Sequence, residues 1–204
     1  MVVDVGGDGR FAAMPVNLTQ GWDLEPGAPL WSADGTAILF SASVSGNRHL
    51  FRVPAAGGPV VQVTDGERQL TSISFSDRGH IMAYAATDAV SPTELYVARG
   101  DGTAERRATE FNEALLDRVS LVPPERLTWI VGDSVEVEGW VIKPVDYTPG
   151  GKYPLILKVH GGPHGAYGNT FFQTFHVLSA AGFIVLYSNP RGSSGEGPEF
   201  KSAT

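Results

Sequence analysis

Residues 155–165 read Leu-Ile-Leu-Lys-Val-His-Gly-Gly-Pro-His-Gly, a short apolar run that ends in a glycine-rich loop. An apolar run of this length fits a strand that is buried on both faces of a sheet. Apolar residues then recur at helical spacing over residues 171–181, and residues 183–187 form a second apolar run. Asn169 is the expected N-cap of the helix, and Gly182 is its expected stop. The order strand, loop, helix, strand predicts a compact α/β unit.

Upstream of this unit, the sequence repeats itself. Residues 31–35 read Trp-Ser-Ala-Asp-Gly, and the similar Phe-Ser-Asp-Arg-Gly begins 44 residues later, at Phe75. Thr64 and Thr109, 45 residues apart, close the two copies. A repeat of roughly 40–45 residues with short strands is typical of a β-propeller blade. Trp31 and Phe75 occupy the same position in the two copies, and we expect both to lie in the core.

Each copy contains four short segments with strand character, separated by Asp-Gly, Gly-Gly or similar turns. Glycine supplies the positive φ that tight hairpin turns need. The predicted strands are residues 30–32, 37–44, 49–54 and 60–64 in the first copy, and residues 72–76, 80–86, 94–99 and 105–109 in the second. Residues 2–9 resemble the third strand and turn of an earlier blade, which predicts about two and a third blades in all. A closed propeller needs about four to eight blades, so we expect further blades before residue 1.

The composition excludes several classes of function. The chain has 204 residues, a net charge of −7 and an isoelectric point of about 5.2, which argues against a basic groove for nucleic acid. It contains no cysteine, which excludes disulfides, thiolate metal sites and a cysteine nucleophile, and favours a cytoplasmic location. No apolar run is long enough for a membrane helix, and no His, Asp and Glu cluster has metal-ligand spacing. We therefore expect no metal, no cofactor, no nucleic-acid partner and no membrane partner.

Two loops carry residue types that catalysis uses. In residues 160–165, glycines let backbone N–H groups approach a ligand closely, as an oxyanion hole requires; the alternative is a plain glycine-rich turn. Residues 189–197 read Asn-Pro-Arg-Gly-Ser-Ser-Gly-Glu-Gly. Ser193 has Arg191 two residues before it, and Ser194 has a glutamate two residues after it, so neither fits the Gly-x-Ser-x-Gly motif of a nucleophile. No other serine of the chain fits this motif.

Residues 153–164, followed by residues 188–195, resemble the opening of the catalytic domain of serine peptidases of the prolyl oligopeptidase family. The His-Gly-Gly-Pro form is most similar to the acylaminoacyl-peptidase and dipeptidyl-peptidase branch, and residues 138–144 are similar to the strand that begins this domain. The resemblance implies a mixed fold, in which antiparallel β-propeller blades precede the N-terminal part of an α/β-hydrolase domain. The implied organisation is a partial β-propeller over residues 1–110, a connector over residues 111–134 and the start of the peptidase domain over residues 135–204.

The resemblance also implies a function, the hydrolysis of peptide bonds by a Ser-Asp-His triad, with a peptide as the substrate. Gly162 corresponds to the donor of the family's oxyanion loop, and Gly161 shapes the turn. His160 stands where other branches carry an oxyanion tyrosine, and it either contacts the oxyanion or orients the loop. His164 and Arg191 are candidate contacts of the substrate or of loops, and a structural salt bridge is the alternative for Arg191. The triad is expected beyond residue 204, so the chain alone is expected to be inactive.

Two other interpretations stay open at this point. The first is a binding module without catalysis, in which the propeller arc and the glycine-rich loop form an interaction surface. The second is an α/β hydrolase of the esterase type, against which the blade repeats argue. His49, His80 and His176 are expected to be structural, because a lone histidine without a paired serine or carboxylate is poor evidence for a triad. The sequence leaves the oligomeric state open.

Overall fold

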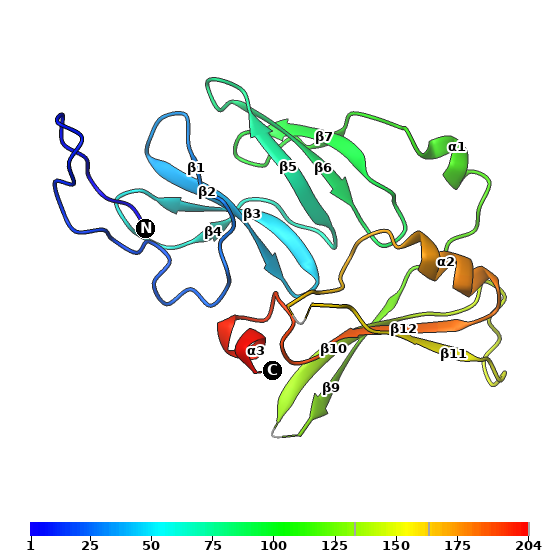
Figure 1. The fold of residues 1–204 in the computed structure, drawn as a ribbon. Coiled ribbons are helices and arrows are strands. Elements are labelled where there is room, and N and C mark those ends of the chain that lie inside the picture. Colours follow the sequence, from blue (N-terminus) through cyan, green and yellow to red (C-terminus); the bar gives the residue numbers. More distant parts are fainter. Residues whose placement is uncertain (133, 163, 204) are drawn as a thin grey trace.

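The computed structural model describes residues 1–132, 134–162 and 164–203, and within them it contains two β-sheets and three short helices (Figure 1). The strands of the first sheet are β1 (Leu30–Trp31), β2 (Ala37–Val44), β3 (Asn47–Pro54), β4 (Val61–Gln62), β5 (Gln69–Phe75), β6 (Ile81–Thr87), β7 (Glu94–Arg99) and β8 (Arg106–Arg107). The strands of the second sheet are β9 (Glu125–Val131), β10 (Val135–Ile142), β11 (Leu155–Lys158) and β12 (Ile184–Asn189).

The first sheet consists of two antiparallel meanders, β1 to β4 and β5 to β8. One parallel pairing, between Arg48 of β3 and Gln69 of β5, joins them. All eight strands overlap the ranges predicted from the repeat, which confirms its strand content. Gly35 and Gly79 have φ values of 67° and 68° in the first turn of each meander, which explains why glycine recurs there. The described residues do not form a closed propeller.

One core cluster of the first sheet lies between the two meanders. Phe75 packs against it as expected, and its buried members are Leu39, Leu50, Leu70, Met82, Tyr84, Ala86 and Ala98. Trp31 is 59% exposed, so its expected place in the core is wrong. It belongs to the edge strand β1, whose outer side no strand of the described residues covers. The expected strand over residues 2–9 is also wrong, because residues 1–16 fold back on themselves and form only isolated bridges.

The second sheet is mixed, with the strand order β11-β12-β10-β9. β11 and β12 are parallel, with helix α2 (Gln173–Ala180) between them in the chain, and β10 pairs antiparallel with both β12 and β9. β9 lies inside residues 111–134, the expected connector, and pairs with β10 along its whole length. The sheet therefore begins at Glu125 rather than at residue 135, and helix α1 (Glu113–Leu116) belongs to the shorter connector that remains.

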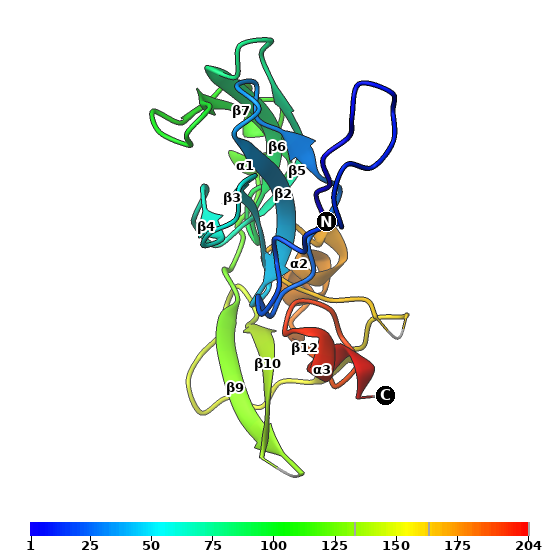
Figure 2. The ribbon, with the colours of Figure 1, turned by 90° about the vertical axis from the view of Figure 1, so that its left-hand side faces the viewer.

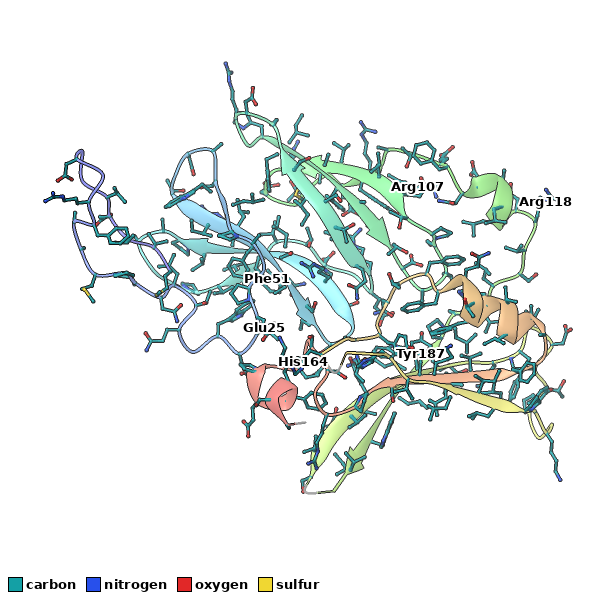
Figure 3. The ribbon with its side chains drawn as sticks, viewed as in Figure 1. Glu25, Phe51, Arg107, Arg118, His164 and Tyr187 are labelled. Atoms are coloured by element: carbon teal, nitrogen blue, oxygen red, sulfur yellow. The ribbon has the colours of Figure 1, made fainter. Side chains whose placement is uncertain are left out.

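Helix α2 packs against β10 and β12 of the second sheet. The buried side chains of this core are Trp140, Ile142, Phe175, Val185 and Tyr187, the last of which is labelled in Figure 3. The helix begins at Gln173 with Phe172 at the N-cap position, so the expected cap at Asn169 is wrong. Asn169 is buried instead, because it bonds to the first sheet: its backbone N–H donates to the Gly46 carbonyl oxygen at 2.8 Å, and its Nδ2 donates to Asn47 Oδ1 at 2.7 Å.

The two sheets meet where the β2–β3 hairpin reaches the second sheet. Figure 2 shows the first sheet above the second, with α2 beside the junction. Ser45 and Gly46 form the two-residue turn of this hairpin, with φ values of 43° and 71°. Gly46 lies against the ring of Trp140. From α2, His176 Nε2–H donates to the Ala89 carbonyl oxygen of the β6–β7 loop at 2.8 Å, so this buried histidine is a structural contact, as expected.

Candidate functional site

The two loops singled out from the sequence leave the second sheet at one edge. We call residues 160–162, 164 and 165, which follow β11, the glycine loop, and residues 190–197, which follow β12, the serine loop. Because β11 and β12 are parallel neighbours, both loops start at the carboxyl ends of their strands. Ligands of open α/β sheets bind at this edge. The structure therefore brings together two motifs that are separated by a helix in the sequence.

Three side-chain hydrogen bonds join the glycine loop to the serine loop. His164 Nδ1–H donates to the Gly192 carbonyl oxygen at 2.9 Å, and Ser194 Oγ–H donates to the His164 carbonyl oxygen at 2.6 Å. The third joins His160 Nε2 to Ser193 Oγ at 2.8 Å. His164 is thus a contact between the two loops, one of the two roles considered for it.

The hydrogen bonds of His160 show how its ring is held. Ser193 has one hydroxyl proton and donates it to the Pro190 carbonyl oxygen at 2.6 Å, so its oxygen accepts the bond from His160 Nε2–H. Nδ1 of His160 lies 3.1 Å from the Gly161 carbonyl oxygen, and the ring stands edge-on to Tyr167. Both ring nitrogens therefore face protein atoms, and the ring joins the glycine loop to the serine loop. Ser193 has 0% of its surface exposed, so a substrate does not reach its hydroxyl.

The two glycines of the loop differ in the space around them. Both are exposed. Gly162 has φ of 150°, and a Cβ built on it would lie 2.6 Å from the backbone nitrogens of both His164 and Gly165. A Cβ built on Gly161 would meet no atom within 4 Å. Position 162 therefore requires glycine for the loop to keep its shape, and position 161 does not.

This difference predicts unequal effects of two alanine substitutions. Gly162→Ala is expected to lower the free energy of unfolding by about 2 kcal/mol, because the Cβ overlaps two backbone nitrogens and the φ disfavours a side chain. Gly161→Ala is expected to stay within about 0.5 kcal/mol of the wild type. Urea unfolding of the three proteins measures both differences. Equal stability of the two variants would show that the glycine loop does not hold this conformation in solution.

Arg191 of the serine loop lies beside Gly132, the residue that follows β9. A Cβ built on Gly132 would lie 2.9 Å from Nη2 of Arg191, so the guanidinium is next to this residue. Arg191 is itself exposed. Contact with a neighbouring loop was one of the roles expected for it, and the structure shows this contact.

A buried carboxylate beside the serine loop was missed by the sequence analysis. Glu138 of β10 is 5% exposed and accepts hydrogen bonds from Arg126 Nη2 at 2.7 Å and from Asn189 Nδ2 at 3.2 Å. Asn189 in turn accepts the backbone N–H of Tyr167 at 2.7 Å, which fixes the segment that follows the glycine loop. Glu196 of the serine loop contributes a second carboxyl group, whose Oε1 is buried without a hydrogen-bond partner among the described residues. The sequence did contain a signal for this carboxylate, because Glu138 takes an inward position in the alternating pattern of residues 135–142.

The Glu196 carboxyl group keeps its proton to a higher pH than a free glutamate does. Burial is the first cause and the facing Glu138 carboxylate the second, with Glu136 adding to them, and together they raise the pKa of Glu196 to about 7 although Arg126 acts in the opposite direction. A raised pKa of an acid stabilises the fold fully below its unfolded value, 4.5, and this contribution is lost as the pH rises through about 7.

Glu196→Gln is therefore expected to match the wild type near pH 4.5 and to exceed its stability near pH 8.5. The expected gain is about 1–2 kcal/mol, less than the full pKa difference implies, because Glu196 is partly exposed and solvent screens the repulsion. A glutamine donates an N–H to Glu138 at any pH, whereas a glutamate does so only when protonated. Urea unfolding of both proteins across this pH range measures the gain.

The comparison between variants also removes the effect of His49. Burial, and then the nearby charge of Arg68, lower the pKa of His49, so the stability from this residue increases with pH in both proteins. Only the difference in the free energy of unfolding between the wild type and Glu196→Gln reports on the pairing of Glu196 with Glu138. A difference that is constant from pH 4.5 to pH 8.5 would contradict the pairing of Glu196 with Glu138.

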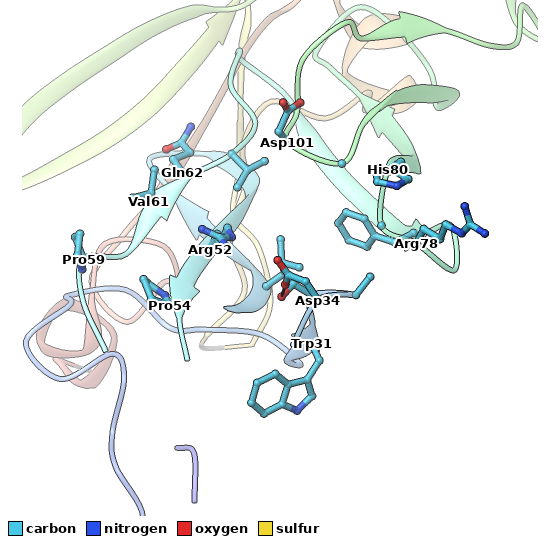
Figure 4. Close-up of a pocket in the computed structure, with 17 residues that line it drawn as sticks. Trp31, Asp34, Arg52, Pro54, Pro59, Val61, Gln62, Arg78, His80 and Asp101 are labelled. Carbon is cyan, nitrogen blue, oxygen red and sulfur yellow. Dashed lines mark hydrogen bonds between the residues drawn. The ribbon is translucent and has the colours of Figure 1, made fainter. Parts of the chain in front are cut away.

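A cavity of about 640 Å³ lies between the two meanders (Figure 4). It is enclosed by turns of both meanders, and Trp31, Arg52, Arg78 and His80 are among its lining residues. All of its lining residues lie between positions 31 and 101, so no atom of the second sheet contributes to it. Among the described residues, no three His, Asp or Glu side chains gather as metal ligands would, and no helix is long and apolar enough to cross a membrane.

The chain is homologous to peptidases, which confirms its resemblance to the prolyl oligopeptidase family. No protein-family profile matches it. It is 34% identical over 176 residues to the uncharacterized peptidase YuxL of Bacillus subtilis, covering 86% of this chain and 26% of that protein. It is 27% identical over 172 residues to dipeptidyl-peptidase 5 of Porphyromonas gingivalis, covering 83% of this chain and 25% of that protein. The chain thus spans about a quarter of the length of the curated relatives it matches.

Solved structures resemble the chain over nearly its whole length. The acylaminoacyl peptidase of Pyrococcus horikoshii superposes with a TM-score of 0.79 at 27% identity, covering 95% of this chain and 29% of that one. Dipeptidyl peptidase 4 of Porphyromonas gingivalis superposes with a TM-score of 0.73 at 21% identity, covering 97% of this chain and 28% of that one, which shows a shared fold alone. Both meanders and the mixed sheet therefore have counterparts in structures of peptidases.

Proposed function

We propose that the chain is part of a serine-type peptidase that hydrolyses short peptides or N-acylated peptides by serine acyl transfer. In this proposal the meanders β1–β4 and β5–β8 are blades of a β-propeller, and β9–β12 with α2 are the N-terminal part of an α/β-hydrolase domain. The strand order of the mixed sheet and the likeness to an acylaminoacyl peptidase in complex with Z-Gly-Gly-Phe-chloromethyl ketone, 26% identical with a TM-score of 0.80, support it.

The observation that carries the proposal is the exposed backbone of Gly161 and Gly162 at the carboxyl edge of the parallel pair. When a nucleophile attacks a peptide carbonyl, negative charge develops on the carbonyl oxygen, and backbone N–H groups that already point at this oxygen lower the barrier. His160 keeps the loop in place through its bond to the buried Ser193. The role of this chain is therefore to stabilise the oxyanion, with Gly162 as the donor and His160 as a positioning residue.

The nucleophile is not among the serines of this chain. No serine has the Gly-x-Ser-x-Gly context of a nucleophile elbow, and Ser193 is fully buried and already hydrogen-bonded on both sides. Oxyanion donors without a nucleophile and a base leave acyl transfer without its main route. We propose that the 204 residues alone do not turn over a peptide.

The test compares the 204-residue chain with the product of the longest open reading frame that contains it. Each protein is incubated with aminoacyl and dipeptidyl nitroanilides, with and without a serine-directed phosphonate. Turnover that the phosphonate blocks is expected only for the longer product, with the label on the serine of a Gly-x-Ser-x-Gly motif. Phosphonate-sensitive turnover by the 204 residues would overturn the proposed inactivity. A longer product that takes p-nitrophenyl esters but not peptides would favour an esterase.

A further inference from the structure

A polar cavity of about 270 Å³ lies between the β2–β3 hairpin and the serine loop. Among the residues that line it are Glu25, Ser41, Ser43, Arg48, Ser194 and Gly195. Strands of the first sheet and the serine loop that follows β12 both line it, in contrast to the larger cavity between the meanders. Its volume is below the range of about 300–1,000 Å³ that is usual for whole small-molecule ligands, so it fits one residue of a longer ligand.

Arg48 supplies the positive charge of this cavity. It stands opposite Ser43 in the β2–β3 ladder, so the two side chains project from the same face of the sheet. Its Nη2 donates to Ser41 Oγ at 2.8 Å, which holds the guanidinium in place and leaves its other N–H groups for a ligand. None of the ion pairs between described residues involves Arg48.

The carboxylate that shares the cavity is already engaged. Both oxygens of Glu25 accept hydrogen bonds from Lys201 Nζ, at 2.9 and 2.7 Å. The Glu25 charge is therefore balanced from the side of helix α3 (Pro198–Ser202), and the Arg48 charge is not balanced by any described residue. A guanidinium with free N–H groups in a polar cavity is suited to bind a carboxylate, often through two parallel hydrogen bonds.

The cavity adjoins the glycine loop through Ser194. This residue lines the cavity, its Oγ–H donates to the His164 carbonyl oxygen at 2.6 Å, and its backbone N–H donates to the Gly165 carbonyl oxygen at 3.3 Å. On the other wall, the backbone N–H of Ser45 donates to the Gly195 carbonyl oxygen at 3.4 Å, which ties the hairpin that carries Arg48 to the serine loop. A peptide whose carbonyl lies at the glycine loop therefore has the cavity next to it.

We propose that Arg48 and this cavity form a subsite that binds a carboxylate group of a peptide. The inference rests on the proposed function insofar as it takes the ligand to be a peptide. The carboxylate comes either from an acidic side chain or from the C-terminus of a short peptide. Both sources present the same group to the guanidinium, and the experiment below separates them.

The test is a binding titration of the chain with three peptides of one length, followed by calorimetry. Acetyl-Ala-Glu-Ala-amide carries only a side-chain carboxylate, acetyl-Ala-Gln-Ala carries only a C-terminal carboxylate, and acetyl-Ala-Gln-Ala-amide carries neither. At least one of the two charged peptides is expected to bind about tenfold more tightly than the neutral peptide, as charge-assisted hydrogen bonds imply. The charged peptide that shows the preference identifies the source of the carboxylate.

Arg48→Gln is expected to abolish the preference, and Arg48→Lys to retain a part of it, because lysine keeps the charge but not the planar fork. Arg52→Gln is the matched control: Arg52 lies on the same strand, donates to the hydroxyl of Thr36 and lines the cavity between the meanders. It is expected to keep the full preference. Thermal unfolding of all variants checks that they are folded.

Three results would overturn the subsite: no preference of the wild type for either charged peptide, a preference that survives Arg48→Gln, or an equal loss in the Arg52→Gln control. The titration measures binding and needs no turnover. Turnover is scored on the longer reading-frame product, because the 204 residues alone are expected to be inactive. A longer product that hydrolyses peptides, with no carboxylate preference in the binding titration, would overturn the subsite alone. A carboxylate preference with a longer product that never hydrolyses a peptide would overturn the peptidase alone.

Discussion

Gly46→Ala is expected to lower the free energy of unfolding by about 2–5 kcal/mol, the sum of a left-handed backbone penalty of about 1–2 kcal/mol and an overpacking penalty of about 1–3 kcal/mol. Gly46 has φ of 71°, and a Cβ at this position would lie 2.5 Å from Cζ2 of Trp140 and 3.3 Å from Cα of Gly168. Trp140 is buried and stacked on Tyr187, so its ring has no room to move aside. Urea unfolding followed by tryptophan fluorescence measures the loss.

Gly35→Ala is the matched control for this prediction. Gly35 has φ of 67°, and a Cβ there would meet no atom within 4 Å. This variant carries only the backbone penalty, so the expected loss is about 1–2 kcal/mol. The difference between the two variants isolates the contact between the hairpin and the second sheet. Equal losses would show that Gly46 does not pack against Trp140 in solution.

Glu94→Ala is expected to destabilise the chain by about 3 kcal/mol at pH 7, because it removes a buried carboxylate that accepts four hydrogen bonds from partly buried donors. The Glu94 carboxylate is 5% exposed and accepts hydrogen bonds from the hydroxyl of Thr109, the backbone N–H groups of Phe111 and Asn112, and the side chain of Asn112. It therefore fixes the point where the second meander passes into the connector. Urea unfolding of the variant and the wild type at pH 7 tests this.

The same carboxylate gives the destabilisation a defined pH dependence. Burial by itself raises the pKa of Glu94, but the hydrogen bonds from Thr109, Asn112 and Phe111 outweigh it and lower the pKa to about 2. A lowered pKa contributes stability above the unfolded value, 4.5, and this contribution is lost as the pH falls through about 2. The difference in the free energy of unfolding between the wild type and Glu94→Ala is therefore expected to decrease from pH 6 toward pH 2.5.

Glu110→Ala is the control, because Glu110 is exposed and only 3.5 Å from Arg107 in a surface pair. Such pairs contribute about 0–1 kcal/mol, so this variant is expected to stay close to the wild type. If the difference in the free energy of unfolding between the wild type and Glu94→Ala is the same at pH 6 and pH 2.5, the carboxylate does not accept these hydrogen bonds.

The strands of the first sheet could be predicted because their signals are local. Repeated glycine turns and alternating apolar residues predicted eight strands, all of which the structure contains. The expected roles of Trp31 and Asn169 were wrong for one reason. Each depends on what lies beside the residue in space: Trp31 stands on an uncovered edge strand, and Asn169 bonds to Gly46 and Asn47 of the other sheet instead of capping its own helix. Local patterns do not record such partners.

The sequence by itself determined the strand repeat, the α/β unit, the glycine loop and the lack of a nucleophile motif, since each of these is a pattern within a few consecutive residues. Only the tertiary structure decided that His160 is bound to Ser193, that Glu196 faces Glu138, and that Arg48 lines a cavity beside the serine loop. These groups are far apart in the chain, and they meet because β11 and β12 are parallel neighbours and the β2–β3 hairpin docks on the second sheet. Contacts of that kind depend on how two sheets pack, which the order of residues along one strand does not specify.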